Sequence, residues 1–204
     1  MKDNGLLVQY FNANTPADQT LWAKAAKDAA TLKKLGATAV WFPPATKGAA
    51  GKDDRGYAPY DLYDLGEFNQ KGSVGTRYGT KKEYLEAIDA MKAQGINVYA
   101  DIAVRQKLGA DSVEKVTAAD FNAKDIPQMI GNKKIVGALS KFTFPGRKSK
   151  YSKFKWNWNH FAGIDWQQDD FKRRVCELSG MTEMEAEKKY KLSKYDYIIG
   201  SELD

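Results

Sequence analysis

The chain has 204 residues, of which 43% are hydrophobic and 12% aromatic, so it can bury a core and is not a disordered polymer. It contains one cysteine and one histidine, which exclude an internal disulfide, a cysteine-based zinc site and any mechanism that needs two histidines. The net charge is +6, and no run of about 18 apolar residues predicts a membrane span. The N-terminus shows no signal peptide, so we expect a cytoplasmic protein.

Strands and helices are predicted to alternate in the first half of the chain. Apolar runs at 5–11, 38–42 and 96–104 have the length of buried strands. Between them, apolar residues recur at helical spacing over 20–35 and 80–94. This alternation predicts an α/β fold with a parallel sheet, which must be covered on both faces. Three strands alone cannot bury both faces of such a sheet, so we expect the sheet to be incomplete on this chain.

Both predicted helices carry start and stop signals. Thr80 and Glu83 have the spacing of a capping box, in which each side chain bonds to the other residue's backbone amide. Thr20 is the expected cap of the first helix, and Gly36 and Gly95 end the two helices. The residues expected to face the core are Leu21, Ala25, Leu32 and Leu35 in the first helix and Leu85, Ile88 and Met91 in the second.

The character of the sequence changes after Val104. Aromatic residues are crowded between 142 and 166 and few helical periods remain, which predicts an irregular β-rich unit. We therefore expect two parts, 1–104 and 105–204. His160 is interpreted as a histidine packed among tryptophans, with a general base as the alternative.

The most basic stretch runs from Arg147 to Lys155 and has aromatic residues between its lysines. This pattern occurs in nucleic-acid-binding proteins. No RNA- or DNA-binding motif accompanies it here, and stacked aromatic rings also suit sugars. Nucleic acid is therefore the less favoured partner.

Several long motifs resemble the liquefying bacterial α-amylases, in the same order and over nearly the whole chain. They are Ala39-Val-Trp-Phe-Pro-Pro44, Gly56-Tyr-Ala-Pro-Tyr-Asp-Leu-Tyr-Asp-Leu-Gly-Glu-Phe68, Arg77-Tyr-Gly-Thr-Lys81, Phe144-Pro-Gly-Arg147 and Tyr151-Ser-Lys-Phe-Lys-Trp156, followed by Asp165-Trp166 and Tyr195-Asp-Tyr197. The resemblance implies that 1–104 form the first three β/α units of a (β/α)8 TIM barrel. It implies that 105–204 form the inserted, β-rich B domain of that family, and that the barrel is incomplete on this chain.

The resemblance also implies retaining hydrolysis of α-1,4-glucans such as starch or glycogen. The family's nucleophile and general acid lie on barrel strands four and five, which we expect beyond Asp204. The chain would then hold no catalytic residue and be inactive alone. The alternative is a non-catalytic relative that binds α-glucan or another protein. An open barrel should also self-associate or need a partner that completes it.

Four residues match positions that the family uses at or near the substrate. Tyr57 matches the tyrosine that stacks on the sugar beside the scissile bond, with loop packing as the alternative. Asp101 matches the aspartate of strand three, with a purely structural carboxylate as the alternative. Tyr60 belongs to the same matching motif as Tyr57, with a structural place in the loop as the alternative. Gln106 replaces a substrate-contacting histidine, and it can hydrogen-bond a sugar but cannot titrate.

The family's cofactor is calcium, but its ligands are depleted in this sequence. Arg105 replaces a ligand asparagine, and a guanidinium has no acceptor atom. Ala162 replaces a ligand aspartate. Asp196 remains as a match, with Glu202 and Asp204 as further oxygen donors. We therefore expect calcium binding to be lost or weak.

Overall fold

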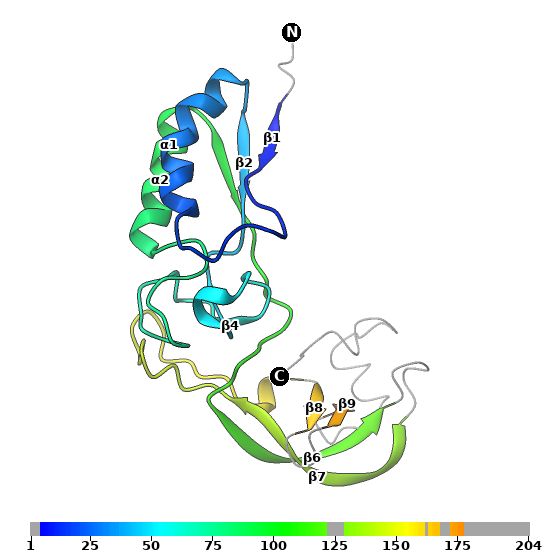
Figure 1. Ribbon diagram of the computed structural model, residues 1–204. Coiled ribbons are helices and arrows are strands. Elements are labelled where there is room, and N and C mark those ends of the chain that lie inside the picture. Colours follow the sequence, from blue (N-terminus) through cyan, green and yellow to red (C-terminus); the bar gives the residue numbers. More distant parts are fainter. Residues whose placement is uncertain (1–4, 122–128, 162, 168–171, 178–204) are drawn as a thin grey trace. The chain divides into compact units, whose positions relative to one another are not determined.

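The computed structural model describes residues 5–121, 129–161, 163–167 and 172–177, and these fall into two compact units (Figure 1). The first unit comprises Met1–Ala103 and Pro145–Arg147. The second comprises Val104–Phe144 and Lys148–Asp204, of which the structure describes residues up to Glu177.

A three-stranded parallel sheet forms the centre of the first unit. Its strands are β1 (Leu7–Gln9), β2 (Ala39–Phe42) and β5 (Asn97–Ala100), in the order β1-β2-β5. Val8, Val40 and Val98 are aligned across it. Each strand falls inside an apolar run of the sequence, so the prediction of three parallel strands is confirmed. The third strand is shorter than the predicted 96–104 and ends at Ala100.

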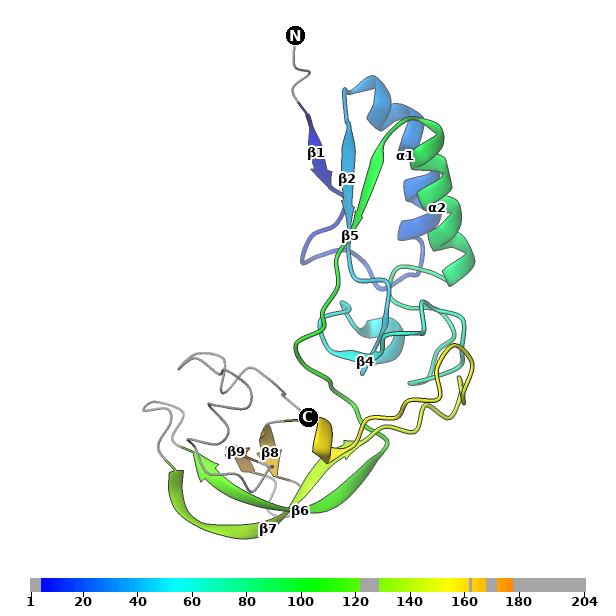
Figure 2. The same cartoon turned by 180° about the vertical axis from the view of Figure 1, so that it is seen from behind.

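Two helices, α1 (Leu21–Lys34) and α2 (Lys81–Ala93), lie on one face of this sheet (Figures 1 and 2). Aromatic rings fill the space between helices and sheet. The Trp22 ring centroid lies 5.2 Å from that of Phe42 and 4.8 Å from that of Tyr84. Val40 is fully buried in the same core. Both predicted helices are therefore confirmed.

The predicted core faces of the helices were partly wrong. Leu35 is 70% exposed because it follows the last residue of α1, and Leu85 is 46% exposed. The buried residues are Trp22, Ala25 and Ala29 in α1 and Tyr84, Ala87 and Met91 in α2. Ala25 and Met91 are thus buried as predicted, and the half-buried Leu21, Leu32 and Ile88 also pack against the core.

Only one of the two predicted caps forms as expected. The Thr80 hydroxyl accepts from the Glu83 amide at 3.4 Å, and the Glu83 carboxylate accepts from the Thr80 amide at 2.8 Å. Thr20 makes no capping bond, because its hydroxyl donates instead to Asp18 at 2.8 Å. Gly36 ends α1 with φ of +89°, which favours glycine.

The segment between β2 and α2 contains short regular elements. β3 (Lys47–Gly48) and β4 (Pro59–Asp61) form an antiparallel pair, and Gly51–Asp53 form a 3-10 helix. The remainder of the segment is irregular and folds around buried polar side chains.

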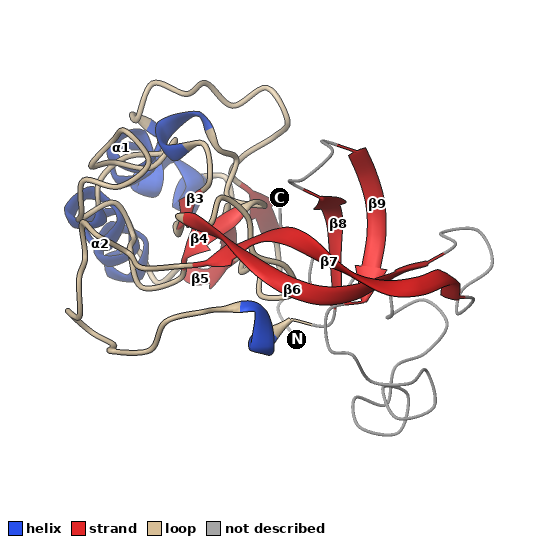
Figure 3. Ribbon diagram, turned by 90° about the horizontal axis from the view of Figure 1, so that it is seen from below, coloured by secondary structure: helices blue, strands red, loops and turns tan. Residues whose placement is uncertain are grey.

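The second unit is an antiparallel sheet in the order β7-β6-β9-β8 (Figure 3). The strands are β6 (Ser112–Phe121), β7 (Met129–Lys141), β8 (Gly163–Gln167) and β9 (Lys172–Glu177). The prediction of a β-rich unit is confirmed, although the β6–β7 hairpin is longer and more regular than expected. None of the helices in the described ranges is long and apolar enough to cross a membrane.

Candidate functional site at the carboxyl end of the parallel sheet

Asp101 is held at the carboxyl end of the parallel sheet. Its backbone amide donates to the Phe42 carbonyl at 3.0 Å, which extends the pairing of β2 and β5 by one residue. Its carboxylate oxygen Oδ2 accepts a hydrogen bond from the Tyr57 hydroxyl at 2.7 Å. Two residues that lie 44 positions apart in the sequence thus form one pair.

The backbone before Tyr57 is fixed by a tight turn. Gly56 has φ of +92°, and its amide donates to Asp54 Oδ1 at 2.6 Å. A Cβ atom at Gly56 would lie 2.7 Å from the Pro44 carbonyl oxygen, so this position accepts only glycine without rearrangement. The turn and the Asp101 contact together determine where the Tyr57 ring lies.

The chemistry of the pair suits a binding platform rather than a proton donor. Burial, and next the hydrogen bond to Asp101, raise the pKa of Tyr57 well above its ordinary value. The phenol therefore stays protonated and keeps donating to Asp101. Because the Tyr57 side chain is still 44% exposed, an anchored aromatic ring is available to a ligand.

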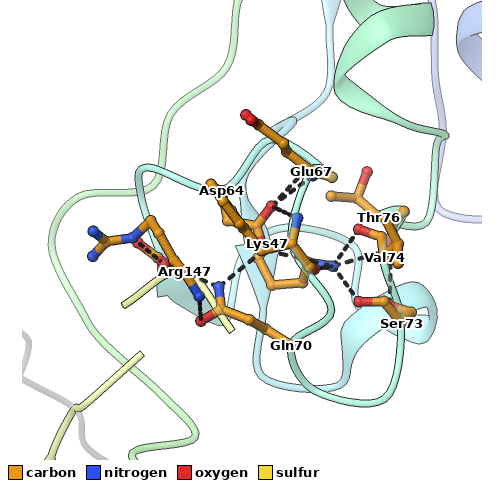
Figure 4. A network of polar contacts seen from close by, with 12 residues as sticks. Lys47, Asp64, Glu67, Gln70, Ser73, Val74, Thr76 and Arg147 are labelled. Atoms are coloured by element: carbon orange, nitrogen blue, oxygen red, sulfur yellow. Dashed lines mark hydrogen bonds and ion pairs between the residues drawn. The ribbon is translucent and has the colours of Figure 1, made fainter. Parts of the chain in front are cut away.

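Lys47 stabilises the loop that carries Tyr57 through polar contacts (Figure 4). Its side chain is completely buried. The ammonium lies 3.7 Å from Asp64 Oδ2. Burial lowers the pKa of Lys47, and the charge of Asp64 opposes this effect. The ammonium also lies within hydrogen-bonding distance of four backbone carbonyls, those of Phe68 at 3.3 Å, Ser73 at 2.8 Å, Val74 at 2.6 Å and Gly75 at 3.3 Å, which share its three N–H donors.

Gln70 connects Lys47 and Asp64 to a second buried ion pair. Its amide nitrogen donates to both Asp64 Oδ2 and Asp61 Oδ2, each at 3.0 Å. Asp61 Oδ2 also accepts from Arg147 Nε at 2.6 Å. The five side chains of Lys47, Asp64, Gln70, Asp61 and Arg147 form what we call the loop network (Figure 4).

Comparison with known proteins gives the context for these residues. No family model matches the chain. The α-amylase of Geobacillus stearothermophilus is 46% identical over 202 residues, which is 98% of this chain and 37% of that protein. The α-amylase of Bacillus licheniformis is 43% identical over 201 residues, 98% of this chain and 39% of that protein. The cytoplasmic α-amylase of Escherichia coli (strain K12) is 37% identical over 208 residues, 98% of this chain and 41% of that protein.

The chain is a relative of the bacterial α-amylases. It spans about 40% of the length of these curated relatives. Among solved structures, a truncated alternansucrase from Leuconostoc mesenteroides matches 72% of this chain and 14% of its own, with a TM-score of 0.55 and 24% identity. At that identity the likeness concerns the fold alone.

Tyr60 and Gln106 were also expected to contact glucan, as in α-amylases. Tyr60 is only 1% exposed, and the Lys71 ammonium lies 4.1 Å from its ring centroid. Tyr60 therefore packs within the loop and offers no ring face to a sugar in this structure. Gln106 is half-buried at the start of the second unit.

The expected calcium ligands of the α-amylase type, Asp196, Glu202 and Asp204, lie outside the described residues, as does Ala162. Among the described residues, no group of three histidine, cysteine, aspartate or glutamate side chains could hold a metal ion. Arg105 is exposed and has no acceptor atom to offer. Of the positions expected around the calcium, the structure thus describes Arg105, whose guanidinium is unsuited to ligate a cation.

His160 occupies an aromatic environment in the second unit, as expected, but remains exposed. Its ring centroid lies 4.9 Å from that of Phe154 and 5.7 Å from that of Trp156. Its Nδ1 accepts from the Asn157 amide at 3.0 Å, which closes a short 3-10 helix at Trp158–His160. These contacts give His160 a structural role.

Lys47 and Arg147 were missed as important residues by the sequence analysis. Both looked like ordinary surface cations, because their partners lie far away in the sequence. The only available signal was that both fall next to or within motifs shared with the α-amylases.

Proposed function

We propose that the chain is part of an α-amylase-type glycoside hydrolase that acts on α-1,4-glucans, and that it supplies substrate contacts. The observation that carries the proposal is the bond between Tyr57 and Asp101 at the carboxyl end of β5. Functional sites of α/β barrels lie at this end of the strands. The sequence similarity to α-amylases supports glucan as the ligand.

In this proposal β1, β2 and β5 are the first three strands of a (β/α)8 barrel, and the second unit is the inserted B domain. The parallel order of the strands and the position of both helices on one face support this assignment. The E. coli relative is named cytoplasmic, which supports a cytoplasmic location.

The geometry of Tyr57 supports the proposed sugar contact. The apolar C–H face of a glucose ring packs against the exposed Tyr57 ring, which Asp101 holds in place through the phenol. Retaining hydrolysis needs two carboxyl groups about 5 Å apart, one as nucleophile and one as general acid. We propose that these belong to later barrel strands, so the 204 residues alone bind glucan without cleaving it.

A binding experiment tests this role. Calorimetric titration with maltoheptaose should show a binding event at Tyr57 that is lost in Tyr57→Ala and retained, though weaker, in Tyr57→Phe. Tyr151→Ala, which removes an exposed tyrosine of the second unit, is the matched control and should bind normally. Equal binding by the wild type and Tyr57→Ala would refute the proposed contact.

A reducing-sugar assay on starch separates two versions of the proposal. We expect no product from the purified chain alone. Product that depends on residues of this chain would show that the reacting carboxylates lie within it. If the complete protein also binds glucan without hydrolysis, the non-catalytic alternative holds.

The uncovered face of the parallel sheet suggests a partner. Leu7 and Tyr99 are 55% and 59% exposed, whereas Val8, Val40 and Val98 pack toward the helices. Both edge strands, β1 and β5, also have one unpaired side in the described sheet. Parallel sheets are normally covered on both faces, so we propose that the isolated chain self-associates or binds further barrel strands. Sedimentation as a stable monomer at micromolar concentration would contradict this.

We also propose that calcium binds weakly or not at all. Arg105 places a positive charge where the family has a ligand oxygen. Calorimetry after exhaustive chelation should then detect no site tighter than about millimolar. A rise in melting temperature with calcium that a chelator reverses would overturn this proposal.

A further inference from the structure

A pocket of about 430 Å³ opens in the second unit, at the base of the β6–β7 hairpin. This volume is within the range of about 300–1,000 Å³ that is typical of small-molecule sites. The pocket is lined by Glu114, Lys141, Phe142, Thr143, Lys155, Trp156 and Asn157. The Phe142 amide donates to the Trp156 carbonyl at 3.0 Å and joins the two segments that form its walls.

Trp156 gives the pocket a rigid aromatic wall. Its ring is half-buried and contacts Phe161, at 5.5 Å between ring centroids, and Phe154, at 5.0 Å. These neighbours hold the indole in one orientation while part of it still lines the pocket. An oriented aromatic surface in a pocket favours ligands with an apolar C–H face.

Glu114 supplies a fixed acceptor beside this wall. Its Oε2 accepts from the Ser140 hydroxyl at 2.6 Å and from the Trp158 amide at 3.0 Å. Within the described part of the chain, Oε1 accepts no further hydrogen bond. A carboxylate held through one oxygen can accept a ligand hydroxyl with the other.

Asn157 and two lysines supply donors. Asn157 Oδ1 caps the short 3-10 helix by accepting from the Asn159 amide at 3.0 Å, which orients the side-chain NH2 group as a donor. Lys141 is exposed, and Lys155 lies with its ammonium 5.0 Å from the Phe144 ring centroid. The lining therefore mixes one carboxylate with an amide and two ammonium groups.

We propose that this pocket binds a short neutral saccharide. Sugar hydroxyls both donate and accept, so they match a carboxylate and an amide on the same wall, and the C–H face matches Trp156. A phosphate or nucleic acid would face the Glu114 carboxylate, and an organic cation would face two lysines. The choice of an α-1,4-linked glucan as the ligand rests on the proposed function.

The test is a titration of the full chain, labelled with 15N, with maltotriose. The indole signal of Trp156, assigned by its loss in Trp156→Phe, should shift and saturate at millimolar ligand. Cellotriose, with β-linkages, serves as the comparison ligand and should bind more weakly. No saturable shift of the Trp156 signal with either sugar would overturn the proposal.

Variants distinguish this pocket from Tyr57. Glu114→Gln keeps an oxygen that accepts from Ser140 and Trp158 but removes the second carboxylate acceptor. Asn157→Asp keeps the oxygen that caps the 3-10 helix but removes the NH2 donor. Each variant should weaken saccharide binding at Trp156 by about tenfold, as loss of one good hydrogen bond implies. Tyr57→Ala should leave the Trp156 titration unchanged. If Tyr57→Ala abolishes it while Glu114→Gln and Asn157→Asp do not change it, the pocket is not a saccharide site and only the proposed function stands. If the Trp156 signal saturates in both the wild type and Tyr57→Ala, and the two proteins also show equal calorimetric binding, the proposed function fails and the pocket stands.

Discussion

Arg147 Nε lies 2.6 Å from Asp61 Oδ2, although 86 residues separate the two in the sequence. Both side chains are at most 1% exposed. A charge buried this completely is stable only while its partner is present. The pair therefore ties Pro145–Arg147 to the loop that also carries Tyr57.

Removal of Arg147 tests the strength of that connection. Arg147→Met should lower the free energy of unfolding by about 3–5 kcal/mol, because it leaves the Asp61 carboxylate buried without a countercharge. Urea unfolding followed by tryptophan fluorescence measures this. Lys148→Met removes the adjacent exposed cation and should change stability by at most about 0.5 kcal/mol. Adding Asp61→Asn to Arg147→Met should recover part of the loss, and no recovery would argue against an uncompensated carboxylate as its cause.

Two glycine substitutions separate backbone strain from steric overlap at the candidate site. Gly56 and Gly72 have φ of +92° and +77°, so Gly→Ala should destabilise each by about 1–2 kcal/mol. A Cβ at Gly72 meets nothing within 4 Å, whereas a Cβ at Gly56 meets the Pro44 carbonyl oxygen at 2.7 Å. Gly56→Ala should therefore lower the melting temperature further than Gly72→Ala and weaken glucan binding through Tyr57. Equal effects of the two changes on binding would show that the turn does not position Tyr57.

The two helix starts offer a matched comparison. Thr80→Ala should destabilise the chain by about 0.5–2 kcal/mol, because it removes the hydroxyl that accepts from the Glu83 amide. Thr20→Ala should cost at most about 0.5 kcal/mol, since within the described ranges the Thr20 hydroxyl bonds only to the exposed Asp18 side chain. Thermal unfolding of both variants measures the difference. A larger loss from Thr20→Ala would contradict the assignment of the caps.

Stability should fall at high pH because of buried tyrosine hydroxyls. Burial, and next the hydrogen bond to Asp28 at 2.6 Å, raise the pKa of Tyr10 to about 12. The unfolded chain loses this proton near pH 10, the ordinary pKa of tyrosine. Between these values the folded state binds more protons, so its stability is complete below about pH 10 and is lost as pH rises toward 12.

Unfolding midpoints in urea at about pH 9 and about pH 11 measure this loss, since the two values bracket the ordinary tyrosine pKa. Tyr10→Phe should show a smaller decrease than the wild type between the two conditions. Tyr99→Phe, at an exposed tyrosine, should behave like the wild type. The interpretation fails if both variants decrease equally.

Local patterns predicted the elements of the first unit well. The apolar runs located β1, β2 and β5, and the spacing of Thr80 and Glu83 located the start of α2, because these signals depend on neighbouring residues. The exposure of Leu85 was not predictable in the same way. It depends on how closely α2 packs through Ala87, which is a property of the assembled core.

The candidate site was predictable only as separate residues. The α-amylase-like motifs indicated Tyr57 and Asp101, but no local pattern predicts a bond across 44 positions. The sequence did not predict the burial of Lys47 either, because a lysine is normally exposed and the carbonyl groups that it contacts lie 21 to 28 residues further along the chain. Long-range polar contacts of this kind are decided by the tertiary fold.

The return of Pro145–Arg147 to the first unit makes that unit discontinuous along the chain. A fragment ending at Ala103 would contain every strand and helix of the parallel sheet but not the guanidinium that neutralises Asp61. The shortest continuous fragment with the complete loop network must run through the β6–β7 hairpin to Arg147. Alternatively, a fragment of 5–103 could be complemented by a separate peptide that carries residues 145–147.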